Sequence, residues 1–199
     1  MTQLDRFYLI VDSTEWLDLL LPLGVKLVQL RIKSEDEDHL SEEIATAKEL
    51  CTEHRAQLIV NDHWQIAIEE GCNFIHLGQE DLDDADLEAI RGAGLKLGVS
   101  THDHAELERA LAIDPDYIAL GPVWPTILKQ MRWNPQGLER VTEWKEMIGN
   151  IPLCAIGGLT PERAMMAFDA GADIAAVVTD ITMNADPESR TQEWLSATR

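Results

Sequence analysis

Residues 57–82 read "QLIVNDHWQIAIEEGCNFIHLGQEDL" and contain the unit that decides the fold. A short apolar run at residues 57–60 is followed by a segment with a helical pattern, then by Gly71 and by a second apolar run at residues 73–77. A glycine between a helix and a strand is typical of a helix C-terminal cap. The stretch therefore predicts a strand, a helix and a second strand of a parallel sheet.

The same alternation continues along the whole chain. The apolar runs are "FYLIV" (7–11), "KLVQLR" (26–31), "QLIV" (57–60), "NFIHL" (73–77), "LKLGV" (95–99), "DYIAL" (116–120), "PLCAI" (152–156) and "DIAAVV" (173–178). Gly24, Gly94 and Gly171 stand before three of them as Gly71 does. Eight such units without a linker predict one α/β domain over residues 1–199, a (β/α)8 TIM barrel. An open doubly wound sheet stays an alternative, because strand order cannot be read from the sequence.

Composition restricts the partners. The 36 acidic residues outnumber the 16 basic ones, giving a net charge of -20, which argues against nucleic acid or an anionic membrane. No apolar run approaches the ~20 residues of a membrane-spanning helix, and "MTQLDRFYLIVDS" lacks a signal-peptide pattern. The three cysteines lack CxxC spacing and are expected to be reduced thiols. We expect a cytoplasmic protein, either a monomer or a homodimer.

The active site of a barrel of this kind lies at the C-terminal ends of its strands. In "LVQLRIK", Gln29, Arg31 and Lys33 are two residues apart, so on a strand they point to one face while the apolar residues between them point to the other. This pattern favours a cationic, anion-binding face at the barrel mouth. A half-exposed edge strand with a solvated face is the alternative.

Carboxylates follow the next two strands. Asn61 and Asp62 end the third strand and Asp81 follows the fourth. Two carboxylates from neighbouring strand ends suit Mg²⁺, which prefers oxygen ligands and bridges to substrate phosphates. Taken alone, Asp62 and Asp81 could equally be helix N-caps.

Other strand ends add hydroxyls and glycines. Ser100 ends the fifth strand, and His76 and His102 are more consistent with hydrogen-bonded structural residues than with a general base. Gly157 and Gly158 follow the seventh strand, where the loops of this fold often bind phosphate through backbone N–H groups. A tight turn into the next helix is the alternative for the glycine pair.

Read in order, "QLRIK", "NDHW", "HLGQEDL", "GVSTHD", "GPVWPT", "PQGLE", "AIGGLT" and "AAVVTDIT" resemble the thiamine phosphate synthase family from about residue 7 to residue 190. The resemblance implies a barrel enzyme of the transferase class. Its expected reaction joins hydroxymethylpyrimidine diphosphate to a thiazole ethyl phosphate, with Mg²⁺ as cofactor, and yields thiamine phosphate and pyrophosphate.

The resemblance also implies roles for individual residues. The pyrimidine diphosphate would be bound by Gln29, Arg31, Lys33, Asn61, Ser100 and Lys129, and Mg²⁺ by Asp62 and Asp81. The thiazole phosphate would be bound by Thr126, Ile127, Leu128, Gly158, Val178 and Thr179. Arg31, Lys33 and Lys129 would be catalytic, because they would stabilise the charge on the departing pyrophosphate.

One position departs from the family pattern. The family usually reads PT-x-TK, whereas "PTILK" places Leu128 where a second threonine is expected.

Two other functions are alternatives to the synthase: a thiazole tautomerase of the same superfamily, and a barrel that binds phosphate without catalysis. The combination of Asp62, Asp81 and three cations favours the synthase, because a tautomerase has no diphosphate to ionise.

Overall fold

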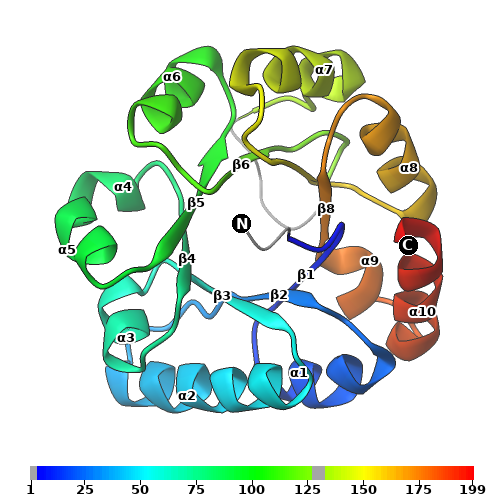
Figure 1. Cartoon of the computed structure of the whole chain (residues 1–199). Coiled ribbons are helices and arrows are strands. Elements are labelled where there is room, and N and C mark those ends of the chain that lie inside the picture. Colours follow the sequence, from blue (N-terminus) through cyan, green and yellow to red (C-terminus); the bar gives the residue numbers. More distant parts are fainter. Residues whose placement is uncertain (1–3, 127–132) are drawn as a thin grey trace.

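The computed structural model describes residues 4–126 and 133–199, which form a closed barrel of eight parallel strands (Figure 1). The strands pair in sequence order, and β1 closes the ring by pairing with β8. They are β1 (Phe7–Val11), β2 (Leu27–Leu30), β3 (Gln57–Asn61), β4 (Phe74–Leu77), β5 (Lys96–Thr101), β6 (Tyr117–Leu120), β7 (Leu153–Ile156) and β8 (Ile174–Val177). The barrel prediction is confirmed, and the open-sheet alternative is wrong.

Helices form a ring outside the strands, as Figure 1 shows. They are α1 (Thr14–Leu20), η1 (Leu21–Leu23), α2 (Glu37–Glu53), α3 (Trp64–Glu69), α4 (Asp81–Asp84), α5 (Leu87–Gly92), α6 (His104–Ala112), α7 (Gly137–Ile148), α8 (Pro161–Asp169), α9 (Thr179–Thr182) and α10 (Pro187–Thr198). Several begin at a side chain that accepts a hydrogen bond from the first turn, for example Asp103 before α6 and Thr160 before α8. None of the helices in the described ranges is long and apolar enough to span a membrane.

Alternation along the strands separates two apolar cores. On β2, Val28 and Leu30 belong to the outer core between strands and helices, whereas Leu27 belongs to the core inside the barrel. The inner core consists of Tyr8, Ile10, Leu27, Ile59, Phe74, Tyr117, Ala119, Cys154, Ile174 and Ala176. These side chains form the apolar packing inside the barrel.

Glycines serve two purposes in this frame. Gly24, Gly71, Gly94 and Gly171 have positive φ before their strands, as the sequence predicts. Gly98 instead provides space inside the barrel, because a Cβ atom there would lie 2.1 Å from Cε1 of Tyr117. The Tyr117 ring therefore occupies the space that any side chain at position 98 would need.

Candidate active site

A cavity of about 790 Å³ opens at the C-terminal ends of the strands. All eight strands or the residues directly after them line it, and the volume falls in the range of small-molecule sites. Gln29, Arg31, Lys33, Asn61, Asp62, Asp81, Ser100, Thr126, Gly158, Val178 and Thr179 all line this cavity. Ile127, Leu128 and Lys129 lie outside the described residues. The structure thus brings together in one cavity every described residue that the sequence selects.

One side of the cavity carries cations. Arg31 and Lys33 follow β2 directly, and the Arg31 backbone N–H donates to the Val11 carbonyl at 2.8 Å. The apolar neighbours Leu30 and Ile32 are buried in the outer core. The predicted division of this segment into a polar face and an apolar face is confirmed, and the edge-strand alternative is wrong, because a closed barrel has no edge.

Two carboxyl groups lie together beside these cations. Burial, and then the charge and hydrogen bond of Asp81, raise the pKa of Asp62 from 3.8 to about 6. Neither residue is a helix N-cap: His63 occupies the N-cap position of α3, and Asp81 lies inside α4, whose N-cap position is Glu80. The N-cap alternative is therefore wrong for both.

The local backbone holds the pair in place. Asp62 has a φ of 64°, and its N–H donates to the His76 carbonyl at 2.9 Å. A Cβ atom at Gly78 would lie 2.7 Å from Oδ2 of Asp81, so the glycine leaves room for that carboxylate. Two carboxylates held this close repel each other unless a proton or a cation lies between them. Among the described residues no group of three or more His, Cys, Asp or Glu side chains could hold a metal ion, so a cation here would also need oxygens from substrate or water.

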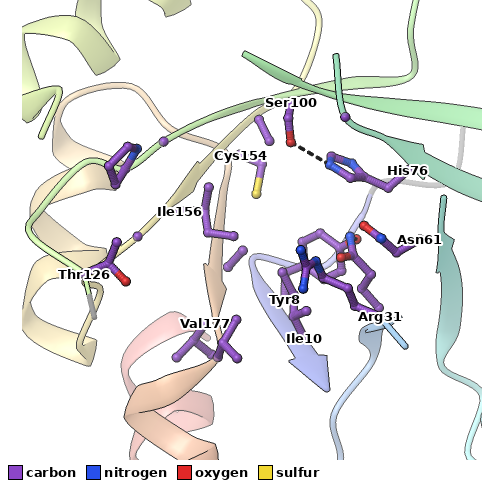
Figure 2. A pocket seen from close by; sticks show the side chains of 18 of the residues that line it. Tyr8, Ile10, Arg31, Asn61, His76, Ser100, Thr126, Cys154, Ile156 and Val177 are labelled. Carbon is purple, nitrogen blue, oxygen red and sulfur yellow. Dashed lines mark hydrogen bonds between the residues drawn. The ribbon is translucent and has the colours of Figure 1, made fainter. Parts of the chain in front are cut away.

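Asn61 presents a buried donor to the same cavity. Its Nδ2 is the one buried side-chain nitrogen or oxygen in residues 4–126 and 133–199 without a hydrogen-bond partner, and the residue is 4% exposed. An unpaired buried amide costs about 1–3 kcal/mol. Figure 2 shows Asn61 near Arg31 on the same side of the cavity. The donor is therefore positioned for a ligand acceptor.

A chain of hydrogen bonds crosses the floor of the cavity. Gln29 Nε2 donates to the Tyr8 hydroxyl at 2.7 Å, the hydroxyls of Tyr8 and Tyr117 are 3.0 Å apart, and the Tyr117 hydroxyl lies 2.7 Å from Nδ1 of His76. His76 Nε2 lies 2.8 Å from Oγ of Ser100 (Figure 2). Burial, together with Arg31, lowers the pKa of His76 to about 3, so its imidazole is neutral at physiological pH.

The two histidines considered from sequence therefore differ in their surroundings. His76 is buried and belongs to the chain of hydrogen bonds, as expected from the sequence for a hydrogen-bonded structural histidine. His102 lies at the rim, where Nδ1 is 2.7 Å from Glu106 and the ring stacks on Trp133 with centroids 5.8 Å apart. Sequence reasoning missed Tyr8 and Tyr117, because an aromatic residue in an apolar strand carries no signal of a polar contact.

The opposite side of the cavity is formed by loops after β6, β7 and β8. Figure 2 shows Thr126 across the cavity from Asn61 and Arg31. The loop after β6 is joined to the loop after β7 by two backbone hydrogen bonds, from Val123 to Ile156 at 2.9 Å and from Trp124 to Gly157 at 3.0 Å. Gly158 has a φ of 64°, and a Cβ there would lie 2.4 Å from the Pro125 carbonyl oxygen. The glycine pair is thus required by the close approach of two loops.

Asp180 is a third residue that the sequence did not indicate. It lines the cavity after β8, but its carboxylate is held by Arg190 at 2.8 and 3.1 Å and by the indole N–H of Trp194 at 2.7 Å. Both Asp180 and Arg190 are less than one-fifth exposed. This ion pair neutralises a carboxylate that would otherwise repel an anion on this side of the cavity.

Comparisons with known proteins agree with this arrangement. The family model described as "Thiamine monophosphate synthase" matches residues 7–181. The chain is 65% identical over 196 residues to the thiamine-phosphate synthase of Rhizobium etli, covering 98% of this chain and 96% of the relative. It is 45% identical over 184 residues to the thiamine-phosphate synthase of Neisseria meningitidis serogroup B, covering 92% and 90%.

A solved structure is similar along almost the whole chain. The thiamine phosphate pyrophosphorylase of Pyrococcus furiosus superposes with a TM-score of 0.86 at 26% identity, covering 97% of this chain and 95% of that chain. The family match and the curated relatives span nearly all of the sequence that forms the barrel and its cavity. The chain therefore belongs to the thiamine monophosphate synthase family and is a transferase of thiamine biosynthesis.

Proposed function

We propose that the cavity joins hydroxymethylpyrimidine diphosphate to a thiazole ethyl phosphate and releases pyrophosphate, with the two substrates at opposite sides. The observation that carries this proposal is the division of one cavity into a side with Arg31, Lys33 and the carboxyl pair and a side with the loop containing Gly158. A reaction between two phosphorylated substrates needs two anion-binding regions facing one space. The volume of about 790 Å³ is sufficient for both.

The pyrimidine diphosphate belongs beside β2. Arg31 and Lys33 would bind the diphosphate oxygens, and the unpaired Nδ2 of Asn61 would donate to the same substrate. The aminopyrimidine ring supplies electrons to its methylene carbon, so the bond to pyrophosphate can break before the new bond forms. Cations fixed next to the leaving group stabilise its growing charge, an effect worth several kcal/mol. Lys129 would add a third cation, as the family resemblance implies.

Asp62 and Asp81 fit a divalent cation. They form a close pair of hard oxygen ligands next to the diphosphate side, and a cation bound between them would relieve the repulsion that, together with burial, raises the pKa of Asp62. Mg²⁺ held there would neutralise charge on the leaving pyrophosphate. Asp62 and Asp81 would orient it, and Arg31 and Lys33 would bind the phosphate oxygens that the ion leaves free.

The thiazole phosphate belongs beside the loops after β6, β7 and β8. Backbone N–H groups around Gly158 and Thr179 would bind its phosphate, with the Thr126 hydroxyl nearby. Holding the thiazole nitrogen against the pyrimidine methylene supplies the positional part of catalysis. The reaction needs no nucleophilic side chain. We also propose that the protein acts in the cytoplasm, as the sequence predicts.

Incubation of the protein with both substrates tests the proposal. Thiamine phosphate and pyrophosphate are expected in equal amounts with Mg²⁺, and neither is expected after chelation. Asp62→Ala and Asp81→Ala should lower kcat at least about 100-fold, because each removes a ligand of the cation. Asp84→Ala is the matched control, since Asp84 lies in the same helix α4 but is exposed and does not line the cavity.

Two results would contradict the proposal. Absence of product with both substrates and Mg²⁺ would exclude the synthase reaction. Thiazole isomerisation that survives chelation and the Asp62→Ala substitution would support the tautomerase instead.

A further inference from the structure

All the hydrogen bonds on the cavity floor run in one common direction. The residues that they join, called the floor chain below, are Gln29, Tyr8, Tyr117, His76 and Ser100. Its members come from β2, β1, β6, β4 and β5 in that order, so it crosses the inside of the barrel. Gln29, Tyr8, Tyr117 and His76 are each at most 7% exposed. Gln29 and Ser100, the two ends, both line the cavity together with the links between them.

Every middle link carries one hydrogen to donate. Burial raises the pKa of both tyrosines above the ordinary value of 10, so both hydroxyls keep their hydrogens. A neutral imidazole has one N–H and one bare nitrogen. Each middle link can therefore donate to one neighbour and accept from the other, and the Gln29 amide also acts as a hydrogen-bond donor toward Tyr117, which favours the same direction. Reversing one link forces the next to reverse, or leaves a buried hydroxyl hydrogen without an acceptor at a cost of about 1–3 kcal/mol.

The first link sets the direction of all the others. Because Gln29 Nε2 donates to Tyr8, the Tyr8 hydrogen goes to Tyr117 and the Tyr117 hydrogen goes to Nδ1 of His76. The imidazole hydrogen is then on Nε2 and is donated to Ser100. At one end, the Gln29 carbonyl oxygen is left as an acceptor, with no hydrogen bond from the described residues. At the other end, the Ser100 hydroxyl is left as a donor, and the bond from Gln79 Nε2 to the Ser100 carbonyl at 2.7 Å fixes its backbone.

We propose that the floor chain makes the cavity select an amino-substituted over an oxo-substituted pyrimidine, with Tyr8 and Tyr117 as positioning residues. This inference rests on the proposed function, which supplies the pyrimidine. The exocyclic amine donates to the Gln29 carbonyl, and a bare ring nitrogen accepts from Ser100. An oxo group in place of the amine would face the Gln29 carbonyl oxygen, acceptor against acceptor.

The floor chain prevents the oxo compound from binding through a simple rotation of the Gln29 amide. Rotating the Gln29 amide would present its N–H₂ group to the oxo group, but the Tyr8 hydrogen would then point to Gln29. All later links would reverse, and Ser100 would turn into an acceptor facing the bare ring nitrogen that both compounds keep. A favourable hydrogen bond between the oxo compound and Gln29 therefore removes the hydrogen bond between its ring nitrogen and Ser100. Sites built on such opposed polar groups discriminate strongly between analogues.

Tyr117→Phe cuts the chain while keeping the ring that fills the space above Gly98. Each half can then reverse alone, so the penalty on the oxo compound falls. Calorimetric titration with the aminopyrimidine diphosphate and the matched oxopyrimidine diphosphate measures binding without the chemical step. We expect the wild-type protein to prefer the amino compound at least about 100-fold, and Tyr117→Phe to reduce that preference at least about tenfold.

A second readout reports the chain directly. Nitrogen NMR of His76 should show a single tautomer with the hydrogen on Nε2 in the wild-type protein and a mixture in Tyr117→Phe. Phe74→Leu is the matched control: Phe74 packs on Tyr117 with ring centroids 5.7 Å apart, but it neither belongs to the chain nor lines the cavity. It should leave both the preference and the tautomer unchanged.

The outcomes separate the two proposals. Equal preference in the wild-type protein and Tyr117→Phe, with the amino compound bound by both, would overturn the chain as a selector and leave the proposed function standing. Failure of the wild-type protein to bind the amino compound would overturn the proposed function, and the selector with it.

Discussion

Asp62→Asn is expected to make the metal-free protein more stable at neutral pH while it removes activity. The carboxyl pKa rises from 3.8 to about 6 on folding, so the folded state binds this proton more tightly than the unfolded state. For an acid this means that the side chain destabilises the fold above pH 6, and that the penalty disappears as pH falls below about 4. The destabilisation by Asp62 therefore develops between about pH 4 and pH 6.

The magnitude follows from the same difference. At 1.36 kcal/mol for each pKa unit, a rise of about two units corresponds to about 3 kcal/mol at pH 7.5. The Asp62 side chain is only half-buried, so solvent screening reduces the expected gain to about 1–2 kcal/mol. Asparagine keeps the shape and a side-chain oxygen but carries no charge, and so it removes the repulsion from Asp81.

Urea unfolding of wild-type, Asp62→Asn and Asp84→Asn proteins in chelator measures the effect. Asp62→Asn should exceed the wild-type free energy of unfolding at pH 7.5 and match it near pH 4, while the exposed control stays within about 0.5 kcal/mol at both. Added Mg²⁺ should stabilise the wild type and not Asp62→Asn. An Asp62→Asn protein that is less stable than wild type at pH 7.5 without metal would refute the reasoning.

Three further predictions concern other parts of the site. Gly158→Ala should raise the KM for thiazole phosphate at least about tenfold, because its Cβ would displace the Pro125 carbonyl; Gly149→Ala, also at positive φ (61°) but with open space around its Cβ, should leave KM unchanged in steady-state assays. The His76 imidazole should show no titration by NMR between pH 5 and 9, since its pKa is about 3; for a base, this lowered value means that stability is lost as pH falls through 6.5, and a titration midpoint near 6.5 would contradict it. Leu128→Thr should lower the KM for thiazole phosphate through a restored phosphate hydrogen bond, and an unchanged or higher value would count against that role.

Much of the fold could be predicted from the sequence because each strand is a short local signal. The run at residues 7–11 coincides with β1, and the run at residues 95–99 differs from β5 by one residue at its start and two at its end. Closure of the barrel was predicted only from the number of units, eight, because it depends on the pairing of β1 with β8, and no local pattern records a contact between the first and last strands.

The candidate site could be predicted where its polar side chains directly follow the strands. Asp62 and Asp81 follow neighbouring strands, so topology alone brings them together. The floor chain was not predictable, because Tyr8 and Tyr117 are 109 residues apart on strands that do not pair, and both stand in runs that look purely apolar. Asp180 was missed for a similar reason: its partners Arg190 and Trp194 come from α10.

The junction between the loops after β6 and β7 has a consequence for how related sequences can vary. The carbonyl of Pro125 occupies the place where a side chain at position 158 would begin, and the backbone bonds of Val123 and Trp124 fix that distance. A relative with a larger residue in place of Gly158 must therefore carry a compensating change in residues 122–125. The two segments should covary as one unit, and a swap of either loop between relatives should succeed when both are exchanged together.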